Sequence, residues 1–277
     1  MSVWLITGCS TGIGRDIATV ALEQGHQVAV TARDESRVAD FVERFGARAL
    51  PLPLDVADQA QCDAAVARTE QALGRVDVLV NNAGYGYLAA VEEGEDAEVR
   101  AMFETNFFGA LSMIKAVLPG MRARQNGYIV NISSMAGLVA NPGTGYYSAT
   151  KFALEGLTEA LSREVAPFGI RVSLVEPGPF RTDWAGRSMK QVAKPIEAYA
   201  DTVGQRRAFI VSMHGRMPGD PRRAAEAIVS LERLDSPPLR LLLGKPVLDM
   251  MRGKLREMEQ TLGEWEGVTL GADFPAP

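Results

Sequence analysis

The chain has 277 residues, of which 47% are hydrophobic and 23% are charged, a composition that excludes a disordered chain, a collagen and a coiled-coil array. Its 29 basic and 34 acidic side chains leave a net charge of −5, which argues against nucleic-acid binding because that function needs a basic face. The two cysteines, Cys9 and Cys62, cannot form a disulfide framework, so we expect a reducing compartment.

The amino-terminal residues MSVWLITG lack the basic start of a signal peptide. No stretch of the chain approaches the ~18 uninterrupted apolar residues that a membrane span requires. These features predict a cytoplasmic protein with neither a membrane nor a nucleic acid as its partner.

Short apolar runs typical of buried strands alternate with longer runs of helical pattern. The expected strands are residues 3–7, 28–32, 49–54, 76–81, 128–132, 172–175 and 239–243. Helices are expected at residues 15–24 and 36–45, and Asp220-Pro221 has the pattern of an N-cap and first residue of a helix before the last strand. This alternation predicts right-handed βαβ units and an α/β, doubly wound parallel sheet with helices on both faces.

A glycine-rich turn at residues 7–14 lies between the first expected strand and the first expected helix. Its G-x-x-x-G-x-G spacing is neither the G-x-G-x-x-G dinucleotide fingerprint nor a triphosphate-binding loop. Glycine lets the backbone bend sharply or approach a phosphate, and the free N–H groups of a helix N-terminus attract anions. The position of the turn predicts a phosphate-binding site, and a tight turn without a ligand is the alternative.

Together with this turn, three further motifs resemble the short-chain dehydrogenase/reductase family. They are Asn-Asn-Ala-Gly at residues 81–84, Tyr-x-x-x-Lys at residues 147–151 with Ser134 thirteen residues before the tyrosine, and Pro177-Gly178 after the sixth strand. The match covers residues 3–182. The stretch KFALEGLTEALSREVAPFGIRVSLVEPGPFRTDW is most similar to the branch that contains the 17β-hydroxysteroid dehydrogenases.

The resemblance implies a single Rossmann-type domain over residues 1–277 that interconverts a secondary alcohol and a ketone or aldehyde. Residues 3–182 would form the cofactor-binding and catalytic core, and residues 183–277 would supply a substrate loop, the last strand and a C-terminal helix. The segment at 178–219 lacks strand pattern and is rich in Gly, Pro, Met and Arg. We interpret it as a substrate loop or lid, with an ordinary surface insertion as the alternative.

The resemblance also implies a set of site residues. The catalytic residues would be Asn106, Ser134, Tyr147 and Lys151. The cofactor-binding residues would be Gly8, Ser10, Thr11, Gly12, Ile13, Gly14, Arg33, Asp55, Val56, Asn82, Ala83, Gly84, Tyr147, Lys151, Pro177, Gly178 and Thr182.

Tyr147 and Lys151 form the centre of the expected chemistry. At positions i and i+4 they share one face of a helix, and an ammonium within ~4–6 Å lowers the pKa of an acid by roughly one to three units. The phenol could then exchange a proton with the substrate oxygen near neutral pH. Tyr146 has Thr150, and no lysine, four residues on. The alternative is an ordinary Tyr–Lys pair on a helix surface.

Two other catalytic assignments keep an alternative. A serine after the strand at 128–132 can hydrogen-bond the substrate oxygen, and the family spacing selects Ser134 over Ser133, which would otherwise cap the strand end. Asn106 would hold a water that relays protons through Lys151, or it would be a buried amide that satisfies backbone groups.

The cofactor is expected to be NADP(H), with NAD(H) as the alternative. Arg33 follows the second strand where an arginine accommodates a 2′-phosphate, although Asp34 could hold a ribose hydroxyl if the strand runs longer. Thr11 stands where some NADP-dependent members carry a basic residue. Asp55 and Val56 resemble the adenine contact of the family, and Asp55 could equally cap the next helix.

Several other features predict no separate chemistry. His26 and His214 have no metal-ligand spacing to other residues, so we expect no metal site. Cys9 fits its turn by its small size, and the acidic run at residues 92–96 is interpreted as a solvated helix entry. The stripe Val247, Met251, Leu255, Met258 and Leu262 predicts a helix that forms core or a subunit interface, with a membrane-surface helix as the alternative.

The substrate is expected to be a bulky hydrophobic carbonyl or alcohol, such as a steroid. Four side chains after the Pro-Gly turn would line an apolar pocket: Phe180, Trp184, Met189 and Met213. The family resemblance implies a homo-oligomer, a dimer or tetramer, assembled through helices near residues 98–124 and 147–167. The alternative function is a catalytically silent NADP-binding redox sensor or scaffold of the same fold.

Overall fold

In the computed structural model, which describes residues 1–186 and 188–274, seven strands form one parallel sheet in the order β3-β2-β1-β4-β6-β7-β9. The strands are β1 (Val3–Ile6), β2 (Gln27–Ala32), β3 (Ala49–Pro53), β4 (Val78–Asn81), β6 (Gly127–Ile132), β7 (Ile170–Pro177) and β9 (Arg240–Leu243). This confirms the predicted doubly wound parallel sheet, and the observed strand ends lie within two residues of the expected ones.

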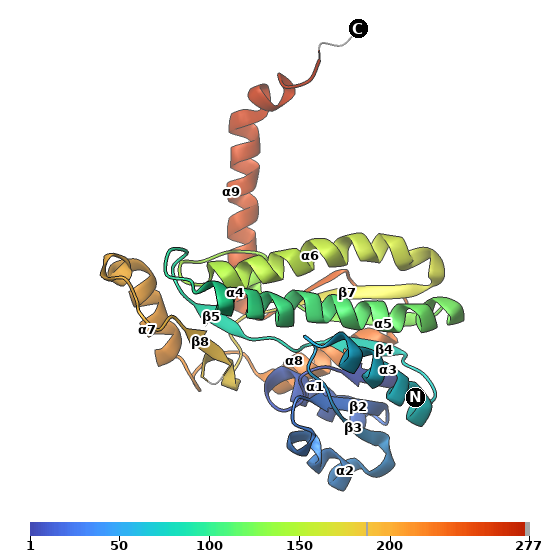
Figure 1. Ribbon diagram of the computed structural model, residues 1–277. Helices are drawn as coiled ribbons and strands as arrows, with labels where there is room; N and C mark the ends of the chain where they lie inside the picture. The colour runs from blue at the N-terminus through green and yellow to red at the C-terminus, as the bar shows by residue number, and fades with distance from the viewer. Residues whose placement is uncertain (187, 275–277) are drawn as a thin grey trace.

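Helices cover both faces of the sheet (Figure 1). One face carries α1 (Gly12–Glu23), α2 (Asp40–Phe45) and α8 (Pro221–Ser230). The other face carries α3 (Gln59–Leu73), α5 (Gly109–Arg124) and α6 (Gly145–Val165), and α4 (Asp96–Phe103) precedes α5. The predicted start of α8 is confirmed, because the Asp220 carboxylate accepts a 2.9 Å hydrogen bond from the Arg222 N–H.

Alternation along the strands divides the core into two apolar layers. In β1, Trp4 and Ile6 pack with α1 and α8, whereas Leu5 packs with the α3 and α5 side chains on the opposite face. All three side chains are fully buried. Burial of each contributes roughly 1.5–3 kcal/mol, so the central strands hold the site above them on a rigid support.

The order of the strands places the topological switch point at the centre of the sheet. The chain builds outward from β1 in one direction through β2 and β3, and in the other through β4, β6 and β7. Ligands of open α/β sheets bind at the carboxyl ends of the strands where the order reverses, which here lies between β1 and β4. The glycine-rich turn at 7–14 and the motif at 81–84 follow these two strands.

The 178–219 segment contains regular structure that its sequence did not indicate. The strand β8 (Met189–Gln191) pairs in parallel with β5 (Gly86–Leu88), and α7 (Gln205–Ser212) follows it. The expectation of no strand was wrong because three residues, with only Met189 buried, are too few to show an alternating pattern. Residue 187 of this segment lies outside the described residues. Residues 275–277, the end of the single domain expected over 1–277, also lie outside them.

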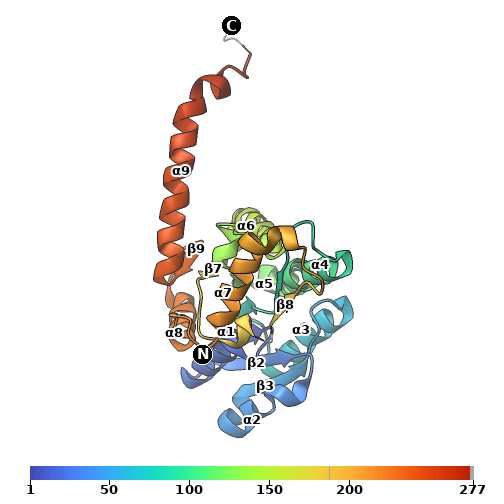
Figure 2. The same cartoon turned by 90° about the vertical axis from the view of Figure 1, so that its left-hand side faces the viewer.

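The last helix, α9 (Lys245–Leu270), leaves the body of the molecule and carries the C-terminus away from it (Figures 1 and 2). Val247 is its buried residue, whereas Leu255, Met258 and Leu262 are exposed. The predicted helix is confirmed, but core is the wrong interpretation for these three residues of the stripe. None of the helices in the described ranges has the combination of length and hydropathy that a membrane-spanning segment needs.

Candidate active site

The glycine-rich turn is held in shape by the loop that follows β4. The Thr7 hydroxyl accepts hydrogen bonds from the backbone N–H groups of Asn82 and Ala83, each at 2.9 Å. The Asn82 amide donates to the carbonyl of Thr7 at 2.8 Å and to that of Gly8 at 3.1 Å. The structure thus brings two of the predicted motifs together at the carboxyl edge of the sheet.

The three glycines of the turn serve two different purposes. Gly8 (φ +74°) and Gly12 (φ +63°) adopt backbone conformations that other residues rarely adopt. A Cβ on Gly14 would lie 2.2 Å from the Asn82 amide nitrogen, so this glycine allows α1 to pack against the loop. Because α1 begins at Gly12, its first N–H groups have no partner within the helix, which fits the binding of a pyrophosphate.

The other predicted residues of the turn lie around this helix start. Thr11 is the residue before the first turn of α1, and Ser10, Thr11 and Ile13 are half-buried. The chain after β7 passes close to the turn, because a Cβ on Gly12 would lie 3.7 Å from the Thr182 Cβ. Gly178 is held at this position by a 2.9 Å hydrogen bond from its N–H to the Leu243 carbonyl.

Beyond the end of β2, Arg33 and Asp34 differ in the hydrogen bonds that their side chains make. Arg33 is exposed and makes no hydrogen bond or ion pair with any described residue. The Asp34 carboxylate accepts hydrogen bonds from the Ser36 hydroxyl at 2.6 Å and N–H at 3.1 Å, which lower its pKa. Since β2 ends at Ala32, the longer strand that would bring Asp34 to a ribose is not present.

Asp55 and Val56 follow β3 at the same edge of the sheet. The Asp55 carboxylate accepts a 3.1 Å hydrogen bond from the Ala57 N–H, and Val56 packs closely against Gly109. The cap of α3 is Asp58, whose carboxylate accepts from two N–H groups of the first turn. The alternative that Asp55 caps this helix is therefore wrong.

Tyr147 and Lys151 lie one turn apart on α6, and both are buried, with 6% and 5% exposure. The Lys151 ammonium lies 5.8 Å from the centre of the Tyr147 ring and donates a 2.8 Å hydrogen bond to the Ile132 carbonyl at the end of β6. Tyr146 donates its hydroxyl to the Val91 carbonyl in the loop before α4. Of the two tyrosines, Tyr147 is thus the one that lies beside the lysine.

Burial dominates the ionisation of both groups. It raises the pKa of Tyr147 to about 12, and the Ser134 side chain partly opposes this rise. It also lowers the pKa of Lys151 to about 8, against the attraction of the Glu155 carboxylate. The sequence predicts a lowered tyrosine pKa, whereas in this structure burial of the phenol raises it and Ser134, not Lys151, opposes the rise.

The two serines after β6 face different neighbours. Ser134 interacts with the Tyr147 phenol, and its hydroxyl accepts a 3.1 Å hydrogen bond from the Ala136 N–H. Ser133 is buried on the other side, where its hydroxyl interacts with the Glu155 carboxyl. The geometry therefore agrees with the choice of Ser134, and Ser133 belongs to a polar group behind the lysine and does not cap the strand.

Asn106 lies in a π-helical turn, Glu104–Phe108, that joins α4 to α5. Its side chain accepts a 3.0 Å hydrogen bond from the Tyr85 N–H and donates to the Tyr85 carbonyl at 2.9 Å and the Thr150 hydroxyl at 3.2 Å. A Cβ on Gly84 would lie 3.1 Å from the Asn106 amide oxygen and 3.8 Å from the Lys151 ammonium. The amide thus satisfies backbone groups beside the lysine, and a role in proton relay stays a prediction.

Apolar side chains surround the Tyr147 ring. The Trp184 ring lies 5.4 Å from it, and Tyr87 and Val192 pack in the same buried cluster. Of the other side chains predicted to line a pocket, Met189 and Met213 pack with Trp184 in an adjoining cluster. Phe180 instead lies against Gly219, away from the tyrosine.

The 178–219 segment is fastened to the acidic run at residues 92–96. The Glu93 carboxylate accepts hydrogen bonds from the Ile196 N–H at 2.8 Å and from the Arg207 guanidinium at 3.1 Å. Burial would raise the pKa of Glu93, but the N–H groups of Ala90 and Ile196 together with Arg207 hold it below its ordinary value. Glu93 is 7% exposed, so a solvated helix entry was the wrong interpretation for this residue.

The family model described as short chain dehydrogenase matches residues 2–193, a span that includes the turn, the Asn-Asn-Ala-Gly motif and the Tyr147–Lys151 pair. The chain belongs to the short-chain dehydrogenase/reductase family.

Curated relatives of this short-chain dehydrogenase cover nearly its whole length. An oxidoreductase of Botryotinia fuckeliana is 38% identical over 98% of each chain. A 3-ketodihydrosphingosine reductase of Bacteroides thetaiotaomicron is 40% identical over 90% of each chain. Human 17-beta-hydroxysteroid dehydrogenase type 1 is 34% identical over 92% of this chain and 81% of its own. This short-chain dehydrogenase is accordingly an oxidoreductase with hydroxysteroid-dehydrogenase-like relatives.

Solved structures agree with the fold and with a nicotinamide cofactor. A short-chain dehydrogenase from Streptomyces avermitilis has 43% identity and a TM-score of 0.92, covering 99% of this chain and 100% of its own. A serine dehydrogenase complexed with NADP+ has 26% identity and a TM-score of 0.75, covering 87% of this chain and 94% of its own. Such neighbours support a nicotinamide cofactor for this short-chain dehydrogenase.

Two sets of residues near the site were not found from the sequence. Glu93 and Arg207 lie more than a hundred residues apart, so only the fold shows that they pair. Behind Lys151, the buried side chains of Ser133, Glu155 and Glu176 form a polar group with the partly exposed Arg240. The sequence did contain one signal for this polar group. Glu176 interrupts the apolar run of β7, and a charged residue in a buried strand is costly unless it has polar partners.

Proposed function

We propose that this dehydrogenase interconverts a hydrophobic secondary alcohol and its ketone or aldehyde with NADP(H), and that Tyr147 is the general acid and base. The observation that carries the proposal is the placement of Tyr147. Its phenol is buried beside Lys151 and Ser134 and under the Trp184 ring, at the edge of the sheet where the glycine-rich turn lies.

The residues around the turn fit a dinucleotide. The bend at Gly8 and Gly12 and the free N–H groups at the start of α1 support a pyrophosphate site there, and Asp55 and Val56 would contact the adenine. Asn82, Ala83 and Gly84, with Pro177, Gly178 and Thr182, would hold the nicotinamide half. When bound, the cofactor supplies or accepts the hydride at the substrate carbon.

Tyr147 and Lys151 on α6 and Ser134 after β6 carry out the proton transfer to the substrate oxygen. With a pKa raised to about 12 by burial, the Tyr147 phenol is neutral at pH 7 and can donate its proton to a carbonyl oxygen. The Ser134 hydroxyl orients that oxygen and stabilises the negative charge that develops on it. Lys151, held by the Ile132 carbonyl, places a cation beside the phenol as the proton leaves.

Arg33 supports a preference for NADP(H). It has no hydrogen-bonding or ionic partner among the described residues, and a guanidinium suits the two-pronged recognition of a phosphate. The carboxylate of Asp34, which would favour NAD(H), is occupied by Ser36.

A hydrophobic substrate is supported by the side chains around Tyr147 and by the relatives. Trp184, Tyr87 and Val192 form an apolar wall beside the phenol. Two relatives at 34% and 40% identity carry hydroxysteroid and ketodihydrosphingosine in their names, both of which denote hydrophobic molecules. We therefore propose a steroid-like or comparably bulky ketone, with the 178–219 segment as the part of the site that encloses it.

The catalytically silent sensor or scaffold is the alternative function, and the retention of Tyr147, Lys151 and Ser134 disfavours it. NADPH consumption across a panel of cyclic, steroidal and long-chain ketones, measured beside NADPH-binding fluorescence, separates the two functions. Turnover on hydrophobic ketones supports the enzyme, whereas binding without turnover on the whole panel would overturn it. The cytoplasmic location and the assembly through the helices near residues 98–124 and 147–167 stay predictions.

A further inference from the structure

Six apolar side chains of α9 form a single stripe with the spacing of a coiled coil. The stripe consists of Leu248, Met251, Leu255, Met258, Leu262 and Trp265. Its members follow one another at alternating steps of three and four residues, the repeat that keeps a seam facing a partner helix. The last four are each at least 50% exposed, so the described part of the chain leaves this seam uncovered.

The outer half of α9 has no support from the body. Every residue from 255 to 274 is exposed, and from residue 258 onward no hydrogen bond or ion pair joins the helix to the rest of the described chain. Gly263 and Gly267 lie in this half and weaken it further. Because isolated helices shorter than ~12–15 residues are marginal in water, this half needs a packing partner.

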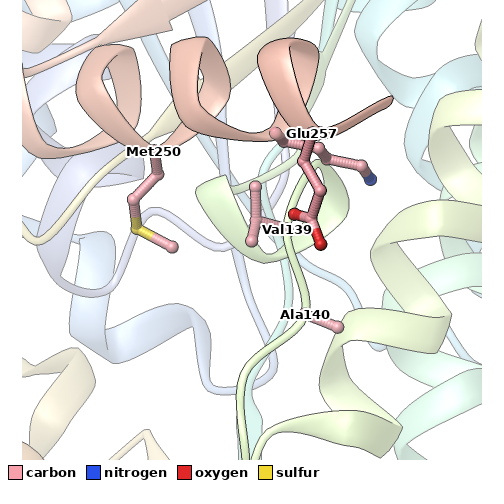
Figure 3. A pocket seen from close by; sticks show the side chains of 5 residues that line it. Val139, Ala140, Met250 and Glu257 are labelled. Atoms are coloured by element: carbon pink, nitrogen blue, oxygen red, sulfur yellow. The ribbon is translucent and has the colours of Figure 1, made fainter. Parts of the chain in front are cut away.

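The inner half of α9 rests on the body and leaves a hollow beside itself. The Lys254 ammonium donates a hydrogen bond to the Leu138 carbonyl. Next to this contact, Met250 and Glu257 point from the helix towards the chain at Val139 and Ala140 (Figure 3), around a hollow of about 350 Å³. The helix residues that line it, Met250, Lys254 and Glu257, each precede a stripe residue by one position, so the hollow lies on the face of α9 next to the stripe.

The two halves of α9 carry opposite charge. The inner half contains one acidic residue, Asp249, and four basic residues: Lys245, Arg252, Lys254 and Arg256. The outer half contains no basic residue and four acidic ones: Glu257, Glu259, Glu264 and Glu266. The halves are complementary to each other only when two copies of the helix run in opposite directions. A negatively charged lipid surface would repel the outer half.

We propose that α9 pairs antiparallel with the α9 of a second copy of this chain. One register aligns the whole stripe: Leu255 faces Met258 of the second copy, Met251 faces Leu262, and Leu248 faces Trp265. The same register sets Arg252 beside Glu259 of the second copy. Each free outer half then packs along the supported inner half of the other copy, next to the hollow at Val139. The proposal does not depend on the reaction proposed above.

The molecular mass in solution tests the pairing. The full chain is compared by light scattering with a stripe variant, Leu255→Glu/Leu262→Glu, and with a matched control, Gln260→Glu, which adds a charge off the stripe. We expect the stripe variant to have half the mass of the full chain and the control to keep the full mass. Equal masses for all three proteins would overturn the proposal, whether or not a second interface exists elsewhere.

Disulfide trapping tests the direction. Met251→Cys and Leu262→Cys chains are prepared separately, incubated together and then oxidised; the native Cys9 and Cys62 are buried and do not compete. Antiparallel pairing gives covalent dimers in the mixture and none in either protein alone. Cross-linking of Met251→Cys with itself, or a monomer that binds vesicles of neutral lipid through the stripe, would contradict the proposal.

Discussion

Glu93, in the loop before α4, pairs with Arg207 of α7 across 3.1 Å, and the two side chains are 1% and 14% exposed. The pair joins the 178–219 segment to the part of the chain that carries Tyr87 and Tyr146. Because the pKa of Glu93 is lowered, the pairing is fully present above about pH 5 and weakens only as acid protonates the carboxylate.

We therefore expect Glu93→Gln to loosen the enclosure of the substrate. The loss of the charge leaves Arg207 without its ionic partner, so KM for a hydrophobic ketone should rise by about tenfold, or ~1.4 kcal/mol. The dissociation constant of NADPH should stay the same. The control is Glu95→Gln, which neutralises a nearby exposed carboxylate that makes no hydrogen bond or ion pair with the described residues. If both variants have the same KM, the segment is a fixed wall and not a lid.

The buried phenol gives the most direct prediction. Tyr147→Phe should lower kcat by at least about a hundredfold, the range of general acid catalysis, while NADPH binding is retained. Tyr146→Phe is the matched control, since its hydroxyl bonds the Val91 carbonyl outside the reaction centre. Steady-state kinetics and cofactor fluorescence give both readouts. Turnover within a few-fold of the parent in Tyr147→Phe would remove the proposed mechanism.

Substitution of Arg33 tests the preference for NADPH over NADH. In Arg33→Ala, the ratio of kcat/KM for NADPH to that for NADH should fall by about tenfold, because a charge-assisted contact to the 2′-phosphate is lost. Arg37→Ala removes another exposed arginine close by and should leave the ratio unchanged. An unaltered ratio in Arg33→Ala would show that other residues set the preference.

Glu176 predicts an unusual dependence of stability on pH. The side chain is fully buried, and its charged contact is Arg240 at 3.9 Å. Burial, helped by the Glu155 carboxylate, raises the pKa of Glu176 to about 8, whereas the unfolded chain titrates near the ordinary value of 4.5. The folded state therefore holds this proton more tightly, and the stability contributed by the protonated group is lost progressively as pH rises from 4.5 to about 8.

Glu176→Gln should remove this loss of folding stability at higher pH. Its unfolding temperature should exceed that of the parent by a margin that widens from pH 5 to pH 8, with a gain of ~1.4 kcal/mol for each pKa unit abolished. Glu159→Gln is the control, because this exposed carboxylate also binds Arg240 but has a lowered pKa. A margin that does not change with pH would show that Glu176 stays ionised in the folded protein.

The strands of the sheet and the motifs of the site were accessible from the sequence because each is local. Apolar runs mark β1, β4 and β7, and the spacing of Tyr147 from Lys151 fixes them on one helix face. The tyrosine pKa was not accessible, because burial depends on Trp184 and Val192, which come from a distant segment. The role of Glu93 was missed for the same reason: its partners Ile196 and Arg207 reach it only through the fold.

The position of Trp184 against the Tyr147 ring has a practical consequence. The chain has three tryptophans, and the other two, Trp4 in the core and Trp265 on α9, lie in other parts of the fold. With Trp4 and Trp265 replaced by phenylalanine, the intrinsic emission of the protein would come from the reaction centre alone. Quenching of that emission in stopped flow would then time the entry of a ligand without any attached label.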